Sequence, residues 1–203
     1  PKNRPSIKKY FFNDNFYKKI LKKKKNDKRL KKVFKRLKKF QKMIKFVYQN
    51  KPEGTGHAVL QCKKYLKGTH FLMLLADDLI VKKNCSKEMI SLHNKTKGSV
   101  IATRKVERKT VSRWGILGFK NKSKNSFLIN DVIEKPKLSE APSNYAIIGR
   151  YILPMKILSV LKNQRKGKGG EIHITDAIKT LIKKNEKFYG NIFKGKIYRL
   201  WDT

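Results

Sequence analysis

The sequence is poor in cysteine and has no long apolar run, and each shortage excludes a class of protein. Its two cysteines, Cys62 and Cys85, match neither a metal-binding spacing nor a disulfide framework. We therefore expect reduced thiols in a cytoplasmic protein. No apolar stretch approaches the roughly 20 residues that a membrane-spanning helix needs, so we expect no membrane partner. The chain has 203 residues, 39% of them hydrophobic, which is enough to bury a core.

Acidic residues are scarce as well, 14 against 52 lysines and arginines, and the net charge is +38. Such a charge normally indicates a nucleic-acid partner. However, nine of the 52 basic residues are arginines and the other 43 are lysines spread along the chain. Surfaces that read bases favour arginine. We therefore interpret most of the charge as lysine on solvated faces, with a polyanion-binding patch as the alternative, and expect no nucleic-acid partner.

A lysine-rich helical segment is predicted over residues 5–42. Short helices are expected at 5–12 and 16–25, and Asp27 can cap a longer helix over 28–42. The lysines lie opposite the apolar face of that longer helix, so we expect it to cover a core rather than to read DNA. Its apolar residues recur at helical spacing and are Leu30, Val33, Phe34, Leu37 and Phe40.

From residue 43 onward, short apolar runs alternate with helical segments. This alternation predicts an α/β fold with a mixed, mostly parallel sheet and flanking helices. We find neither an internal repeat nor a linker, so we expect one domain over residues 1–203. Strands are expected at 43–48, 71–75, 99–104, 115–119, 127–134, 145–152, 188–193 and 197–201. Helices are expected at 57–65, 86–96, 154–162 and 175–185.

A glycine-containing loop follows the first expected strand. In the stretch 49–58, glycine at position 54 allows a backbone to approach a ligand closely, and the free N–H groups of the next helix favour anions. Gln49 offers both a donor and an acceptor, which suits the edge of a nucleobase. An ordinary strand–turn–helix connection would give the same pattern.

Two adjacent carboxylates, Asp77 and Asp78, follow the most apolar run of the chain. Ligands of open α/β sheets bind outside the carboxyl ends of the strands. Adjacent acids repel each other unless a cation or hydrogen bonds compensate, and Mg²⁺ prefers one or two carboxylates together with phosphate oxygens. The pattern indicates a magnesium site, with helix capping by Asp78 as the alternative.

An acid lies beside a base where Glu134 and Lys135 end another apolar stretch. The carboxylate can accept hydrogen bonds from sugar hydroxyls and the ammonium can bind phosphate, so the pair suits a phosphorylated sugar; a surface ion pair is the alternative. Gly115 is a weaker signal: it allows a backbone to approach a sugar ring or simply to enter a strand tightly. In the stretch 169–178, Thr175 or Asp176 is expected to cap a helix.

The order of these motifs resembles that of the bacterial UTP–glucose-1-phosphate uridylyltransferases, within the sugar-nucleotidyltransferase superfamily. The resemblance covers essentially the whole chain, and its most specific part begins at residue 132. The matching motifs are, in chain order, N-R-P-S-I-K-K-Y-F-F, Q-x4-G-x-G-H-A-V-L, L-L-x-D-D, W-G-I, V-I-E-K-P-x4-A-P-S-N-x-A-I-I-G-R-Y and G-G-E-I-x-x-T-D-A-I.

This resemblance implies a Rossmann-like nucleotidyltransferase fold. It also implies Mg²⁺-dependent uridylyl transfer from UTP to glucose 1-phosphate, giving UDP-glucose and pyrophosphate. The full-length protein is expected to form a homo-oligomer.

Individual roles follow from the resemblance too. In the nucleotide half of the site, Gln49 and Gly54 would recognise uracil, and Asp77 would be the catalytic magnesium ligand. Asp202 would supply a second metal carboxylate, in an altered motif. In the sugar half, the resemblance implies that glucose is contacted by Gly115 and Glu134, and that its phosphate is held by a catalytic Lys135.

The sequence departs from the family pattern at both ends. The family opens with a G-x-G-T-R type loop and a P-K-E-M segment, which hold the triphosphate, and neither motif occurs here. The opening residues are not an initiator sequence, and the family's C-terminal helices are missing. We therefore expect a domain truncated at both ends. The alternatives are an inactive fragment, a related sugar-1-phosphate nucleotidyltransferase that uses another nucleotide, and a basic nucleic-acid-binding protein.

Overall fold

A computed structural model describes residues 8, 11–12, 14–24, 27–81 and 83–199. The chain divides into two compact units, Pro1–Pro52 and Glu53–Thr203. The lysine-rich segment predicted over residues 5–42 falls within the first unit. That both units belong to one incomplete nucleotidyltransferase domain remains a prediction.

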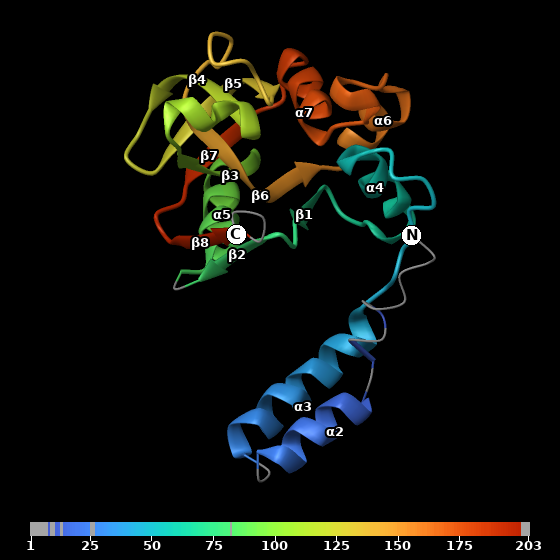
Figure 1. Cartoon of the computed structure of the whole chain (residues 1–203). Coiled ribbons are helices and arrows are strands. Elements are labelled where there is room, and N and C mark those ends of the chain that lie inside the picture. Colours follow the sequence, from blue (N-terminus) through green and yellow to red (C-terminus); the bar gives the residue numbers. More distant parts are fainter. Residues whose placement is uncertain (1–7, 9–10, 13, 25–26, 82, 200–203) are drawn as a thin grey trace. The chain divides into compact units, whose positions relative to one another are not determined.

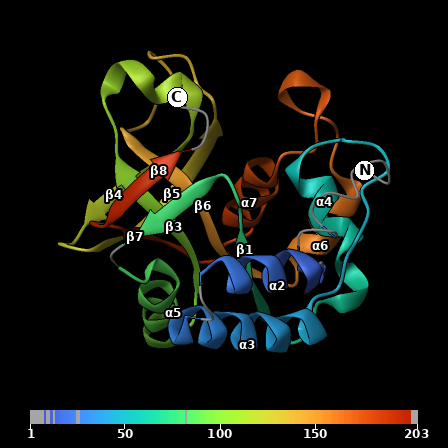
Figure 2. The same ribbon diagram turned by 60° about the horizontal axis from the view of Figure 1, so that its bottom comes forward.

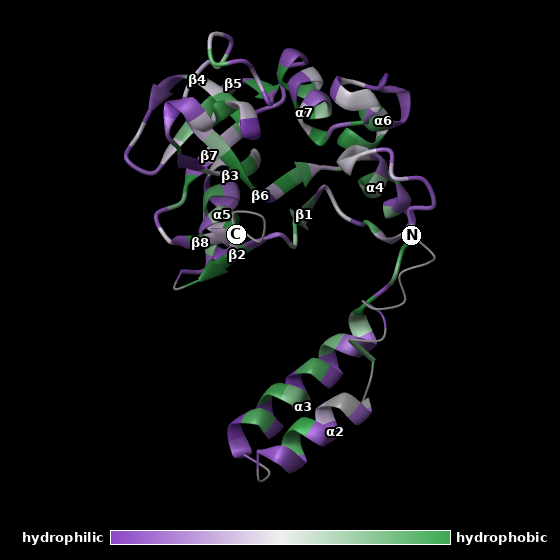
Figure 3. Cartoon of the chain, viewed as in Figure 1, coloured by the Kyte–Doolittle hydropathy of each residue, from purple (hydrophilic) through white to green (hydrophobic). Residues whose placement is uncertain are grey.

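The described part of the first unit is a pair of basic helices, α2 (Asp14–Lys23) and α3 (Lys28–Met43) (Figure 1). Asp27 caps α3 as predicted, since its carboxylate accepts hydrogen bonds from the N–H groups of Arg29 at 2.6 Å and Leu30 at 3.4 Å. The rings of Tyr17 and Phe34 lie 4.8 Å apart between the helices. Figure 3 shows apolar and polar residues alternating around both helices, so a narrow apolar seam joins them.

Two expectations for this unit are corrected. The helix α2 begins at Asp14, two residues before the start expected at residue 16. The strand expected at 43–48 is not formed: Met43 ends α3, and residues 44–49 are irregular. Within the described part of this unit there is no strand with which those residues could pair. The helix expected at 5–12 falls mostly outside the described residues.

The second unit is built on a six-stranded sheet of order β1-β6-β3-β7-β5-β4. Beside it lies a two-stranded sheet of β2 (Asp78–Val81) and β8 (Lys196–Arg199). The six strands are β1 (His70–Leu74), β3 (Ser99–Lys105), β4 (Gly115–Lys122), β5 (Ser126–Glu134), β6 (Tyr145–Pro154) and β7 (Phe188–Ile192).

The large sheet is mixed, as predicted, but it is not mostly parallel. Among the described pairings, only β3 and β7 run parallel, and all the others are antiparallel. The reason lies in two connections: β4 and β5 form a hairpin, and β6 inserts between β1 and β3 in the opposite direction to both. Alternation of strands and helices along a sequence does not reveal such a reversed interior strand.

Helices cover both faces of the sheet (Figures 1 and 2). Successive strand residues point to opposite faces. On one face Ile101 and Ile147 pack with α4 (Thr55–Gln61), α6 (Ile157–Asn163) and α7 (Ile174–Lys183).

On the other face, Val100 and Ile148 pack with Met89 and Cys85 of α5 (Cys85–Thr96). As far as residue 199, the helices and strands expected after residue 53 form with small shifts at their ends, and the structure adds the short strand β2 and two short 3₁₀ helices, Arg108–Arg113 and Lys168–Gly170. None of the described helices combines the length and the apolar character needed to cross a bilayer.

The two cysteines are free thiols with different environments. Cys85, the first residue of α5, is 2% exposed, and burial, together with repulsion from Glu88, raises its pKa to about 12. Because the raised pKa keeps Cys85 as an unreactive thiol at pH 8, we expect Ellman's reagent to label Cys62 first and Cys85 only as α5 opens in denaturant. Equal labelling rates in native buffer would contradict this packing.

Candidate active site

A cavity of about 180 Å³ opens where several strands end and α7 begins. It is lined by six of the residues singled out in the sequence, which come from widely separated parts of the chain: Asp77, Asp78, Gly115, Glu134, Lys135 and Thr175. The structure adds Arg113, Trp114, Glu171 and His173 to the same lining. Folding therefore brings the expected metal ligand and the expected sugar-phosphate residues to one cavity.

The carboxylate of Glu134 is held in place by a neighbouring hydroxyl. Thr175, which is buried at the start of α7, donates a hydrogen bond to Glu134 Oε2 at 3.0 Å. Thr175 was expected to cap that helix, but the N-cap residue is His173 and it makes no side-chain cap bond. The role of Thr175 is thus to orient a carboxylate, with the other lone pairs of Glu134 left for a ligand.

A glycine lies directly beside this carboxylate. Gly115 begins β4 and is paired with Glu134, the last residue of β5. A Cβ at position 115 would lie 3.2 Å from Glu134 Oε2 and 3.0 Å from Ile147 Cδ1. Any larger residue would therefore crowd Glu134, and glycine keeps the space beside the carboxylate open.

Lys135 has an unusual backbone conformation. Its φ is +45°, in the left-handed region that a residue other than glycine seldom adopts. Two hydrogen bonds hold it: its N–H donates to the carbonyl of Trp114 at 2.9 Å, and its carbonyl accepts from Lys168 Nζ at 2.6 Å. The left-handed residue ends the strand, so the Lys135 side chain lies exposed at the cavity next to Glu134.

Asp77 has a buried oxygen that lacks a partner. Its Oδ1 is buried and makes no hydrogen bond, and a buried charged group left unsatisfied costs more than the ~1–3 kcal/mol of a neutral group. Such an oxygen fits a divalent cation. No cluster of three or more potential metal ligands exists among the residues described, and Mg²⁺ commonly uses one or two carboxylates together with phosphate oxygens and water.

Asp78 is positioned differently from its neighbour. It is 2% exposed and begins the strand β2, so it does not cap a helix. Its carbonyl accepts a hydrogen bond from Arg150 Nη2 at 2.7 Å. Both acids line the cavity, but Asp77 carries a buried oxygen without a partner, whereas Asp78 begins the strand β2.

Arg150 is a positioning residue that sequence reasoning missed. Its guanidinium donates from Nη1 to the carbonyl of Leu75 at 2.5 Å and from Nη2 to that of Asp78, so it bridges the two ends of the loop that carries Asp77. The signal in the sequence was a single arginine in an otherwise apolar run. A charged side chain in a buried strand needs hydrogen-bond partners.

The remaining predicted residues lie elsewhere. Gly54 has φ +99°, and a Cβ there would lie 2.8 Å from the carbonyl of Ile172, so glycine is needed for backbone packing whether or not it also contacts a base. Gln49 belongs to the first unit, and Asp202 lies outside the described residues. The uracil-binding roles and the second metal carboxylate therefore remain predictions.

Comparison with known proteins agrees with the geometry. The family model described as Nucleotidyl transferase matches residues 7–202. A UTP–glucose-1-phosphate uridylyltransferase of Streptococcus pyogenes is 37% identical over 165 residues, which are 78% of this chain and 54% of the relative. The chain thus spans about half the length of the curated relatives that it matches.

Solved structures show the same likeness. A UDP-glucose pyrophosphorylase complexed with UDP-glucose is 36% identical, with a TM-score of 0.72 over 76% of this chain and 59% of that one. The apo form of a UDP-glucose pyrophosphorylase is 31% identical, with a TM-score of 0.81 over 97% of this chain and 72% of that one. These matches confirm the resemblance found in the motifs, and the chain belongs to the nucleotidyl transferase family.

Proposed function

We propose that the protein catalyses Mg²⁺-dependent transfer of a uridylyl group from UTP to glucose 1-phosphate, giving UDP-glucose and pyrophosphate. The observation that carries the proposal is the convergence of an oriented carboxylate, an exposed ammonium and an unpartnered aspartate oxygen on one cavity. The relatives named for this activity support the choice of substrates.

The sugar half of the cavity suits glucose 1-phosphate. Glu134, oriented by Thr175, accepts hydrogen bonds from sugar hydroxyls, and the space at Gly115 admits the ring. Lys135 binds the phosphate as a point charge. A carboxylate next to an ammonium thereby selects a ligand that carries both hydroxyls and a phosphate.

The nucleotide half centres on Asp77. Its buried Oδ1 would hold the magnesium ion, which when bound supplies positive charge to the nucleotide phosphates. Arg150 keeps Asp77 at the cavity through the two flanking carbonyls. We assign uracil recognition to Gln49 and Gly54, and a second metal carboxylate to Asp202, on the motif resemblance alone.

The chemistry needs positioning rather than a covalent intermediate. A phosphate oxygen of glucose 1-phosphate attacks the α-phosphorus of UTP, a new P–O bond forms, and the bond to the β-phosphate oxygen breaks as pyrophosphate leaves. Two anions must meet for this to occur, so Lys135 lowers the barrier by offsetting their repulsion. We further propose a cytoplasmic location and a homo-oligomeric full-length protein, as the resemblance implies.

A turnover assay tests the proposed function. With UTP, glucose 1-phosphate and Mg²⁺ we expect equal amounts of UDP-glucose and pyrophosphate, and little product from dTTP, CTP or ATP. Asp77→Asn should lower turnover by roughly 10²–10³-fold, as for the loss of a main electrostatic group. Asp131→Asn is the matched control, because Asp131 pairs with Lys179 at 2.9 Å and does not line the cavity.

The alternatives give other results in the same assay. Product from a different nucleotide would identify a related sugar-1-phosphate nucleotidyltransferase, and saturable binding of glucose 1-phosphate without turnover would identify an inactive fragment. Failure to bind glucose 1-phosphate, together with tight RNA binding at about 150 mM salt, would contradict the proposal.

Lys135 should contribute to affinity for the acceptor. Lys135→Gln removes the ammonium at the cavity, so we expect the Kd for glucose 1-phosphate, measured by calorimetry, to rise roughly 10-fold or more, as for the loss of a hydrogen bond to a charged group. Lys137→Gln, two residues away and outside the cavity lining, changes the net charge equally. Equal losses for the two variants would mean that only general charge matters.

Thr175 should act on the sugar through Glu134. Thr175→Val keeps the shape of the side chain and removes the hydroxyl that orients the carboxylate, so we expect a several-fold loss of affinity for glucose 1-phosphate with no change for inorganic phosphate. Thr180→Val is the control on the same helix, because its hydroxyl donates to the Asp176 carbonyl. A parallel loss for both ligands would indicate a purely structural role.

A further inference from the structure

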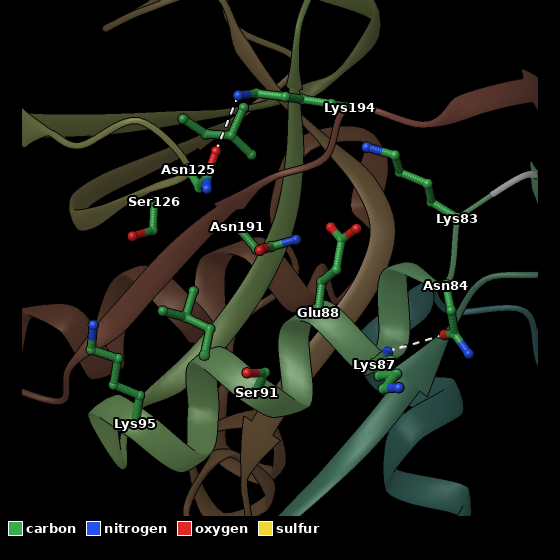
Figure 4. A pocket seen from close by; sticks show the side chains of 12 residues that line it. Lys83, Asn84, Lys87, Glu88, Ser91, Lys95, Asn125, Ser126, Asn191 and Lys194 are labelled. Carbon is green, nitrogen blue, oxygen red and sulfur yellow. Dashed lines mark hydrogen bonds between the residues drawn. The ribbon is translucent and has the colours of Figure 1, made fainter.

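A larger cavity, of about 660 Å³, lies away from the candidate active site (Figure 4). It is bounded by α5, by the start of β5 and by the end of β7, and the two cavities share no lining residue. The proposed transfer reaction uses none of these residues.

Asn191 lines this cavity and carries a buried donor that has no partner. On β7 it alternates with Gly190 and Ile192, which belong to the face covered by α7, and so it points to the face covered by α5. Asn191 is 6% exposed, and its Nδ2 is buried without a hydrogen-bond partner. Because buried polar groups are nearly always paired, this amide indicates a missing acceptor.

Positive charge surrounds the amide. Figure 4 shows Asn191 and Glu88 near the centre of the view, with lysine side chains around them. The lining includes four lysines and one carboxylate, Glu88, besides the hydroxyls of two serines. The lysines are Lys83, Lys87, Lys95 and Lys194.

Lysines alone would not define a site in a chain with so many of them. The buried amide and the cavity distinguish these four lysines from the other lysines of the chain. Their ammonium groups can bind phosphate as point charges. Glu88 opposes a bare polyanion, because its carboxylate repels phosphate, but it can accept hydrogen bonds from hydroxyls. The lining therefore favours a ligand that has both phosphate and hydroxyl groups.

We propose that this cavity is a second binding site, for a small phosphorylated molecule that carries hydroxyl groups. The lysines bind the phosphate, Asn191 donates its unused amide hydrogen to a phosphate or hydroxyl oxygen, and Glu88 accepts hydrogen bonds from the hydroxyls. Binding here is separate from substrate binding at Asp77 and Lys135, and it does not depend on the proposed transfer reaction.

Nuclear magnetic resonance of the ¹⁵N-labelled chain tests the site. Ribose 5-phosphate is titrated at about 150 mM salt, and we expect saturable shifts of the Asn191 side-chain NH₂ signals, which Asn191→Asp identifies by removing them. Shifts restricted to the candidate active site, or linear shifts without saturation, would overturn the proposal.

Charge variants show whether the lysines of this cavity bind the ligand specifically or whether the overall positive charge of the chain is sufficient. The triple variant Lys83→Gln, Lys87→Gln, Lys95→Gln should weaken ribose 5-phosphate binding roughly 10-fold or more. A matched triple, Lys120→Gln, Lys162→Gln, Lys183→Gln, removes the same charge from exposed positions outside the lining. Equal weakening by the two triples would overturn the proposal.

A Glu88→Gln variant tests the hydroxyl requirement, with inorganic pyrophosphate as the comparison ligand. We expect the wild type to prefer ribose 5-phosphate, and the variant to bind it several-fold more weakly while it binds pyrophosphate equally well or more tightly. If the variant instead binds both ligands more tightly by the same factor, Glu88 accepts no hydrogen bond from a ligand hydroxyl, and the proposed ligand class is wrong.

Discussion

The candidate active site depends on one charged group in an interior strand of the sheet. Arg150, in β6, donates hydrogen bonds to the carbonyls of Leu75 and Asp78, which flank Asp77 on either side. The register between β3 and β6 shifts near this point, and Gly149 there has a φ of +63°. A bulge of this kind re-aims the side chain that follows, so an irregularity in the sheet directs a guanidinium onto the loop that carries the expected metal ligand.

The sugar half of the cavity is built on the hairpin of β4 and β5 and on the first turn of α7. Gly115 and Glu134 are register partners, and Thr175 reaches the carboxylate from the helix. The elements that position the two halves meet because β6 pairs with β1 on one side and with β3 and β4 on the other. The loop that follows β1 and the hairpin of β4 and β5 therefore bring their residues to the same cavity from opposite sides of β6.

Much of this arrangement could be predicted from the sequence, and the missing parts have physical reasons. Asp77, Glu134 and Lys135 follow apolar runs directly, so local pattern places them at strand ends, where ligands bind. Strand direction was predicted wrongly because β6 enters the sheet in reverse, which depends on long-range pairing. The tasks of Arg150 and Thr175 were missed for the same reason: each acts on a residue more than 40 positions away in the chain.

The central claim is that this cavity binds a sugar phosphate, and a crystal structure of the chain soaked with glucose 1-phosphate and Mg²⁺ tests it most directly. The account predicts sugar hydroxyls at the Glu134 carboxylate, the ring against Gly115 and the phosphate at the Lys135 ammonium. Glucose 1-phosphate bound only in the cavity beside α5, or a cavity at Glu134 that stays empty at saturating ligand, would contradict it.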